Sequence, residues 1–330
     1  RKQIGEKLIE LGWKPKKFTE TGQPMVDEGV LSEITKIPEA AMIAEYLMLQ
    51  KRVAQITSWL EAVKDDGRVH GKVITNGAVT GRMTHSSPNM AQIPNAGSVY
   101  GHECRECWTV EEGNVLVGCD ASGLELRMLA HYMKDEGYVR TVTEGSSKDG
   151  TDVHTVNQRA AGLATRDNAK TFIYAFLYGA GDAKIGSIVG GSAKAGAKLK
   201  QKFLEQTPAL AKLIKRVAKQ ATKGWVPGLD GRRIWVRSEH AALNSLLQGA
   251  GAIVMKKALC IFYDKIKSNK WSVKLVANVH DEFQFECHQS IAEEVGKAAR
   301  MSIIEAGQFY QLRCPLDGEY KIGRNWKETH

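Results

Sequence analysis

The sequence has 330 residues, of which 43% are hydrophobic and 25% charged. This composition is that of an ordinary globular protein and excludes a disordered or fibrous chain. The length is sufficient for two or three domains with substantial cores. No apolar stretch approaches the roughly 18 residues of a membrane span, and no signal-peptide core follows Arg1. Since the chain does not begin with methionine, we expect a segment of a longer protein.

The 46 Lys and Arg outnumber the 37 Asp and Glu, which gives a net charge of +9. Between Lys194 and His240 there are twelve basic and three acidic residues, so this stretch alone carries a net charge of +9. A local basic patch indicates a polyanionic partner, most often nucleic acid. The alternative is a solvated helix face.

The cysteines do not form a metal-binding pattern. Only Cys104 and Cys107 are closely spaced, and no second pair follows that would complete a structural zinc site. We therefore expect all six to be free thiols in a reducing compartment. They are Cys104, Cys107, Cys119, Cys260, Cys287 and Cys314.

In chain order, the first third of the sequence predicts helices followed by a strand. Helical spacing of apolar residues occurs before Gly12 and again over 38–63. Residues 71–83 predict a strand and a turn. An apolar strand is expected over 114–120, and a helix over 123–133.

The remaining elements are also mostly helical. In order, we expect helices over 151–178 and 194–223, a hairpin around 229–231, a helix over 241–265, strand–turn–strand over 271–287, and a last helix over 291–306. The glycine-rich stretch 179–186 follows a helix and not a strand, so we interpret it as a helix break and linker rather than a phosphate-binding loop. Helices and strands fall in separate runs, which predicts the α+β class.

Two carboxylates lie at exposed ends of apolar strands. Asp120 ends the strand over 114–120, and Asp281 lies at the tip of the hairpin within 271–287. Carboxylates at such positions suit Mg²⁺, and two of them could hold two cations for an in-line displacement at phosphorus. The alternative is that each is an ordinary strand-end or turn residue. Their separation of 161 residues does not show that they meet.

A third feature lies on one helix. Arg166, Lys170, Tyr174 and Tyr178 recur every four residues and form one stripe, with Thr165 as a candidate N-cap. The cations lie toward the helix N-terminus, where the dipole favours anions. The stripe therefore has the polarity of a nucleoside triphosphate. An amphipathic helix with core tyrosines would show the same spacing.

A second stripe consists of His240, Asn244 and Gln248, again four residues apart. Asn and Gln can donate to the minor-groove acceptors that every base pair presents, so this stripe could test base-pair shape without reading sequence. The alternative is a polar helix surface.

These residues resemble the motifs of family A DNA polymerases. Asp120–Arg127 is similar to motif A, Arg166–Gly179 to motif B and Val279–Glu282 to motif C. Thr80–Arg82 and Pro88–Pro94 are similar to the primer–template segment of the family. A closer resemblance, to replicative polymerases of short-tailed phages, is carried by 12–15, 45–52, 229–232 and 323–326.

The resemblance implies a right-hand fold with an antiparallel-sheet palm, helical fingers and a truncated helical thumb. Residues 1–69 would be the thumb remnant with connecting helices, and 70–133 the first part of the palm. Residues 134–244 would be the fingers, and 245–330 the second part of the palm.

The resemblance also implies roles for the carboxylates. Asp120 and Asp281 would bind two Mg²⁺ ions, which Mn²⁺ can replace, together with the carbonyl of Ala121. Glu282 would support this metal site. Lys170 would join Asp120, Asp281 and Glu282 as a catalytic residue.

For the incoming dNTP, the resemblance implies three groups that grip the triphosphate, namely Arg166, Lys170 and His154. Tyr174 would pack on the sugar, and a tyrosine there is associated in the family with tolerance of a missing 3′-hydroxyl. Glu125 would block a ribose 2′-hydroxyl while hydrogen-bonded to Tyr178. The implied primer–template contacts are Arg82, Gln92, His240, Asn244, Gln248 and His280.

The implied function is template-directed DNA synthesis, in which dNMP from a dNTP is added to a primer 3′-hydroxyl and pyrophosphate is released. The expected location is the cytoplasm of an infected bacterial host, with an organellar origin as the alternative, and no membrane is involved. A processivity factor is conceivable for a longer protein, with its site outside this segment. Asp317–Glu319 has the spacing of an exonuclease motif but not its context, so proofreading is not expected from these residues.

Two other functions remain open on the sequence. A single-subunit RNA polymerase shares the palm and a similar fingers helix, although Glu125 and the tetrad Val279–Glu282 argue against it. A non-catalytic DNA-binding module, with structural carboxylates, is the second alternative.

Overall fold

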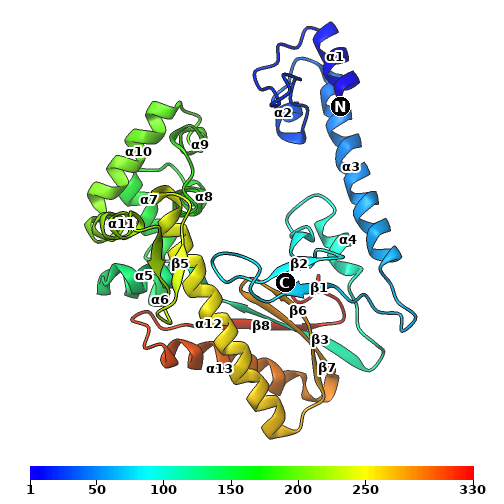
Figure 1. The fold of residues 1–330 in the computed structure, drawn as a ribbon, viewed down its shortest axis with the longest axis vertical. Helices are drawn as coiled ribbons and strands as arrows, with labels where there is room; N and C mark the ends of the chain where they lie inside the picture. The colour runs from blue at the N-terminus through cyan, green and yellow to red at the C-terminus, as the bar shows by residue number, and fades with distance from the viewer. The chain divides into compact units, whose positions relative to one another are not determined.

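The computed structural model describes all residues from Arg1 to His330. The chain forms two compact units, Arg1–Lys72 and Val73–His330 (Figure 1). Each unit has its own hydrophobic core, and the candidate site residues lie in the second. The predicted division of residues 70–330 into palm and fingers stays a prediction.

The first unit consists of α1 (Lys2–Glu10), α2 (Glu28–Ser32) and α3 (Pro38–Glu61). Pro38 occupies the first turn of α3, where its missing N–H costs nothing. Leu8 and Leu31 are buried and form a small core with Ile37 and Ala40. Both helical stretches predicted for these residues are present.

The second unit is built on a four-stranded sheet in the order β6-β7-β3-β8, with antiparallel pairing throughout. Its strands are β3 (Asn114–Ala121), β6 (Val273–Val279), β7 (Glu282–His288) and β8 (Gly318–Gly323). Because β3 lies between two strands that come much later in the chain, Asp120 is placed opposite Glu282 on one side and Glu319 on the other.

Two long helices join this sheet to the rest of the second unit. α13 (Ala292–Phe309) packs on β3 and β8, and α12 (Glu239–Asn269) packs on α13, α5 (Leu124–Met133) and α11 (Pro208–Ala221). Figure 1 shows α12 running from the group of helices α7–α11 (residues 153–221) to the sheet. The ring centroids of Phe262 and Phe285 are 4.4 Å apart in this core.

The sequence-based statement that no stretch approaches a membrane span needs correction for α12. By length and hydropathy this helix could cross a membrane, because its apolar residues are interrupted by few charges. However, 67% of its most apolar window is buried inside the protein. α12 therefore has the properties of a core helix.

The helical group of the second unit contains six helices and one hairpin. They are α6 (Glu136–Glu144), α7 (Val153–Ala161), α8 (Arg166–Leu177), α9 (Asp182–Ser187), α10 (Ala193–Gln206), α11 (Pro208–Ala221), β4 (Trp225–Pro227) and β5 (Arg233–Trp235). The remaining short elements are β1 (Lys72–Ile74), which pairs with β2 (Thr84–Ser86), then η1 (Met90–Gln92), α4 (Gly101–Glu106) and η2 (Gln289–Ile291).

The α+β prediction is confirmed, and most predicted elements are present. The interpretation of 179–186 as a linker is wrong in its second half, because α9 begins at Asp182. The stretch over 151–178 that was expected to be helical contains two helices, since Gly162 ends α7 with a φ of +70°. α4 and α6 were not predicted. All six cysteines are unpaired, as expected.

Candidate active site

The structure brings together the two carboxylates that the sequence left apart. Asp120 is the penultimate residue of β3, and Asp281 lies in the two-residue turn between β6 and β7. The backbone N–H of Ala121 donates to the carbonyl of Asp281 at 3.0 Å, which ties the two strand ends together. His280, the other turn residue, has a φ of 60°. The turn geometry thus fixes the position of Asp281 beside Asp120.

Burial and neighbouring negative charges raise the pKa values of both Asp120 and Asp281. Burial, together with the charges of Asp281 and Glu282, raises the pKa of Asp120 to about 7. Glu319, opposite Asp120 on β8, also raises this pKa. Burial is the main cause that raises the pKa of Asp281. Since repulsion between like charges disfavours ionisation of both groups, a cation bound here would stabilise the ionised pair.

Glu282 differs from its two neighbours because it is held by hydrogen bonds. It accepts from the indole N–H of Trp326 and from Gln284 Nε2 at 2.6 Å, and His330 Nδ1 lies 3.2 Å from Oε2. Burial alone would raise its pKa, but these hydrogen bonds outweigh burial and lower it. Thr329 Oγ1 in turn donates to Gln284 Oε1 at 2.9 Å. The last turn of the chain therefore fixes an ionised Glu282.

The predicted stripe on α8 is present, and Thr165 is its N-cap, accepting from the N–H of Asn168 at 3.1 Å. Lys170 is exposed. Arg166 Nε donates to both oxygens of Asp152, at 3.1 and 3.3 Å, a contact the sequence did not indicate. This bond uses only Nε, so the four N–H groups on the terminal nitrogens remain for other acceptors.

His154 lies beside this cationic end of α8. Its imidazole is half-buried, and burial, with the charge of Arg166, lowers its pKa, so the neutral form is favoured at pH 7. Its buried Nδ1 has no hydrogen-bond partner within the protein. The ring centroids of His154 and Tyr174 are 6.3 Å apart.

The aromatic end of the stripe approaches the carboxylates. Tyr174 and Tyr178 have ring centroids 6.4 Å apart and nearly parallel planes, at 28°. Burial, followed by the charges of Glu125, Asp281 and Asp120, raises the pKa of Tyr174. Tyr174 therefore links the α8 stripe to the carboxylate pair in space.

Glu125 is the centre of a small polar cluster. Tyr178 donates its hydroxyl to the carboxylate at 2.7 Å, which confirms the predicted hydrogen bond. Arg82 Nη2 also donates to Glu125 at 3.0 Å, and the two side chains are only 17% and 13% exposed. Arg82 was expected to contact DNA, and nothing in the sequence indicates its ion pair with Glu125, 43 residues away.

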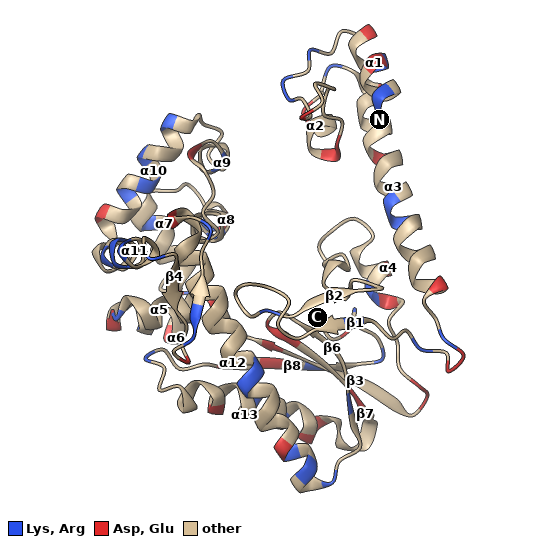
Figure 2. Ribbon diagram, viewed as in Figure 1, with Lys and Arg blue, Asp and Glu red and all other residues tan.

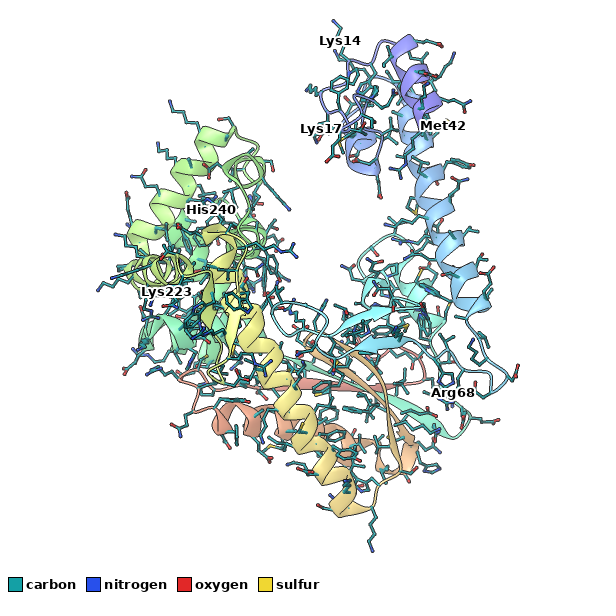
Figure 3. All side chains as sticks on the ribbon, in the orientation of Figure 1. Lys14, Lys17, Met42, Arg68, Lys223 and His240 are labelled. Atoms are coloured by element: carbon teal, nitrogen blue, oxygen red, sulfur yellow. The ribbon has the colours of Figure 1, made fainter.

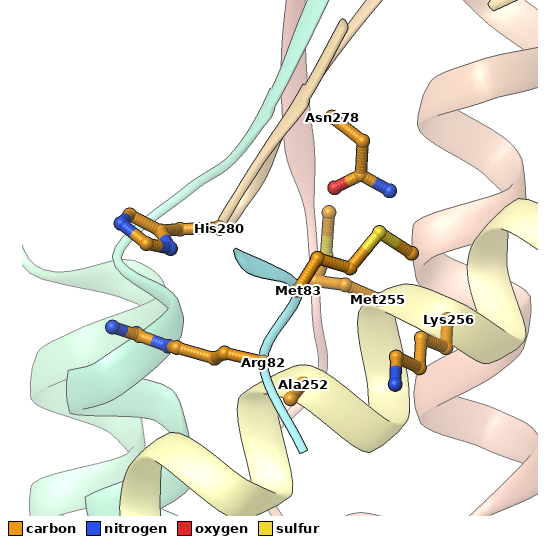
Figure 4. Close-up of a pocket in the computed structure, with 7 residues that line it drawn as sticks. All are labelled: Arg82, Met83, Ala252, Met255, Lys256, Asn278 and His280. Atoms are coloured by element: carbon orange, nitrogen blue, oxygen red, sulfur yellow. The ribbon is translucent and has the colours of Figure 1, made fainter. Parts of the chain in front are cut away.

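Arg82 and His280 line a shallow depression together with residues of α12 and with Asn278 of β6 (Figure 4). In Figure 4 the side chains of Arg82 and His280 lie next to one another on one side of the depression, and Lys256 lies on its other side. Burial, followed by the charge of Arg82, lowers the pKa of His280. Lys256 donates to the carbonyl of Thr75 at 2.6 Å. Two of the predicted primer–template residues, Arg82 and His280, therefore lie side by side in this depression.

The other predicted primer–template residues lie on α12 and η1. His240 is exposed at the start of α12, with half-buried Asn244 and Gln248 following on the same helix, whereas Gln92 ends η1. Figure 3 labels His240, at the start of α12, and Lys223, which precedes β4. The basic residues of α10 and α11 form blue bands in Figure 2.

The chain matches the model of DNA polymerase family A over residues 1–328. It is 44% identical to the DNA-directed DNA polymerases of Enterobacteria phage T3 and Escherichia phage T7, over 100% of this chain and 52% of each relative. DNA polymerase I of Caldicellulosiruptor bescii is 30% identical over 95% of this chain and 38% of that protein.

The fold is similar to that of a solved structure, the POL domain of Pol1 from M. smegmatis in complex with DNA primer-template and dNTP. The TM-score is 0.88 with 25% identity, over 99% of this chain and 61% of the other. The fold and the carboxylate site thus define a polymerase-type domain, and the chain belongs to DNA polymerase family A. It spans about half the length of the phage relatives it matches.

Proposed function

We propose that this chain carries out template-directed DNA synthesis. The primer 3′-oxygen forms a bond to the α-phosphorus of a dNTP, the bond to the β-phosphate oxygen breaks, and pyrophosphate leaves as the hydroxyl proton is lost. The observation that supports this proposal most strongly is the convergence of Asp120 and Asp281, whose strand ends are tied by the hydrogen bond from Ala121 N–H to the Asp281 carbonyl.

The residues present fit divalent cations. Asp120, Asp281 and the carbonyl of Ala121 offer the oxygen ligands that Mg²⁺ prefers, with Mn²⁺ as a substitute. No group of three or more His, Cys, Asp or Glu side chains is placed to hold a metal ion by itself. Water and substrate oxygens would therefore supply the remaining ligands of a bound cation. Two bound ions would neutralise phosphate charge and favour ionisation of the primer hydroxyl. Glu282, held by the last turn of the chain, adds fixed negative charge to this site.

The cationic end of α8 would bind the triphosphate. Arg166, oriented by Asp152, and exposed Lys170 place positive charge near the N-terminus of the helix. The imidazole of His154, half-buried beside Arg166 and neutral at pH 7, could donate an N–H to a phosphate oxygen. These three groups would stabilise charge on the departing pyrophosphate.

The aromatic end would bind the sugar. Tyr174 would pack against the deoxyribose, and Glu125, held by Tyr178 and Arg82, would occupy the space of a 2′-hydroxyl. His280 and the stripe on α12 would contact the minor groove at the primer end. The phage relatives support a location in an infected bacterial cell.

The test is primer extension by the 330-residue chain with dNTPs and Mg²⁺, at low salt where phosphate contacts bind DNA most tightly. Asp120→Asn and Asp281→Asn should each abolish nucleotide addition while DNA binding, measured by anisotropy, is retained. Asp264→Asn, an exposed aspartate on α12, is the matched control. Retained synthesis in either site variant would refute the assignment. Equal use of rNTPs by the unaltered chain would favour an RNA polymerase.

A further inference from the structure

The β4–β5 hairpin has one face that the fold does not use. Trp225 pairs opposite Trp235, and Val226 opposite Ile234. Because side chains alternate across a strand, Val226 and Ile234 share one face while Trp225, Trp235 and Arg233 share the other. Val226 and Ile234 are buried, and β4 packs on α11 and α12. Val226 and Ile234 therefore hold the hairpin against the helices, and Trp225 and Trp235 lie on its opposite face.

Trp235 is 60% exposed, which is unusual for a side chain that is highly buried on average. The hairpin that carries it is closed at its base by a hydrogen bond from the N–H of Val236 to the carbonyl of Gly224 at 3.0 Å. The guanidinium carbon of Arg233 lies 4.8 Å from the centroid of the Trp225 ring. The outer face is thus an aromatic surface with the guanidinium of Arg233 stacked on Trp225.

The surroundings of this face are basic. Lys223 and Arg237 are exposed immediately before and after the hairpin strands. The hairpin acid, Asp230, is neutralised by Arg232 at 2.7 Å. The hairpin also adjoins the candidate site, because a Cβ built on Gly81, the neighbour of Arg82, would lie 3.5 Å from Arg232 Nη1. The hairpin therefore lies close to the candidate site, and its unpaired basic neighbours are Lys223 and Arg237.

We propose that this face, the Trp225–Trp235 platform, binds a single-stranded segment of nucleic acid, with bases stacked on Trp235 and phosphates paired with Lys223, Arg233 and Arg237. An unpaired base offers a free π-face, whereas bases in a duplex already stack on one another and expose only their edges. The basic residues around the tryptophans favour an anionic ligand over an uncharged apolar one. The proposal rests on the proposed polymerase function only in naming the strand, which is the unpaired template ahead of the primer end.

The experiment measures affinity of the 330-residue chain for two labelled DNAs by fluorescence anisotropy. One is a primer–template with a 5′ overhang of ten thymidines, and the other is the same duplex with a blunt end. Trp235→Ala should weaken binding of the overhang substrate by about fivefold to 100-fold, the scale of one lost base–aromatic stack. Trp235→Phe keeps a π-face, so this variant should retain most of the affinity of the unaltered chain for the overhang substrate. Phe309→Ala removes a comparably exposed aromatic of α13 and should change neither affinity.

The outcomes separate the proposal from its rivals. A loss confined to the overhang substrate supports the platform, whereas an equal loss on both DNAs, or no loss on either, overturns it. Sedimentation that shows a dimer for the unaltered chain and a monomer for Trp235→Ala would assign the face to a second copy and also overturn it. Primer extension by the unaltered chain tests the polymerase proposal separately, because an inactive chain that still prefers the overhang retains the platform.

Discussion

Replacing Trp326 by phenylalanine should destabilise the second unit through Glu282. Trp326 is buried, and its indole N–H donates to a carboxylate that is only 6% exposed. Phenylalanine keeps an aromatic ring but has no donor. Glu282 would then rely on Gln284 and His330 alone.

The expected loss follows from the charge and burial of the acceptor. A hydrogen bond to a charged group contributes about 1.5–3 kcal/mol, and a buried carboxylate that loses a donor bears the desolvation cost. The smaller ring also weakens the contact with Arg105, whose guanidinium carbon lies 4.7 Å from the Trp326 ring centroid. At pH 7 we therefore expect the free energy of unfolding to fall by at least about 1.5 kcal/mol.

The pH dependence separates the hydrogen bond from packing. Burial opposes ionisation of Glu282, but hydrogen bonds lower its folded-state pKa below the ordinary value of 4.5. A lowered folded pKa stabilises the protein above the unfolded pKa, and this stabilisation is lost as the pH falls through the folded value. The difference between the two proteins should thus be largest at pH 7 and shrink below 4.5, as Glu282 becomes protonated.

The assay is urea unfolding at pH 7 and at a series of acidic pH values, followed by near-UV circular dichroism. Trp235→Phe, an exposed tryptophan without a hydrogen bond to a carboxylate, is the control. An equal loss for Trp326→Phe at every pH would show that packing alone is responsible. No loss at pH 7 would refute the role of the indole donor.

Three further predictions concern other parts of the second unit. Thr165→Ala removes the N-cap of α8 and should lower the free energy of unfolding by about 1 kcal/mol, measured by urea titration, while Thr165→Ser should not. Glu125→Ala should reduce the preference for dNTP over rNTP by up to about 100-fold in single-nucleotide incorporation, and an unchanged ratio would remove it from sugar selection. Charge reversal to Glu at Lys212, Lys215 and Lys219 of α11 should weaken DNA binding and flatten its salt dependence, and an unchanged salt slope would place the DNA elsewhere.

The features that the sequence determined are local ones. The stripe on α8 follows from residues spaced four apart, and Thr165 caps it because its hydroxyl reaches an N–H three residues on. Likewise, Asp281 lies in a turn because apolar strands flank it on both sides. Such features depend on neighbours in the chain, so periodicity and turn chemistry predict them without tertiary contacts. The resemblance supplied the implied roles of these residues.

Tertiary structure alone decided which of these parts meet. Asp120 and Asp281 lie together because β3 is inserted between β7 and β8, an order that the strand sequences do not specify. The same order places Glu319 beside Asp120, although its motif had been set aside. Contacts across 43 and 44 residues, from Arg82 to Glu125 and from Trp326 to Glu282, depend on side-chain packing of distant elements. Periodicity carries no information on such pairs, because their energy arises only once burial removes water from both partners.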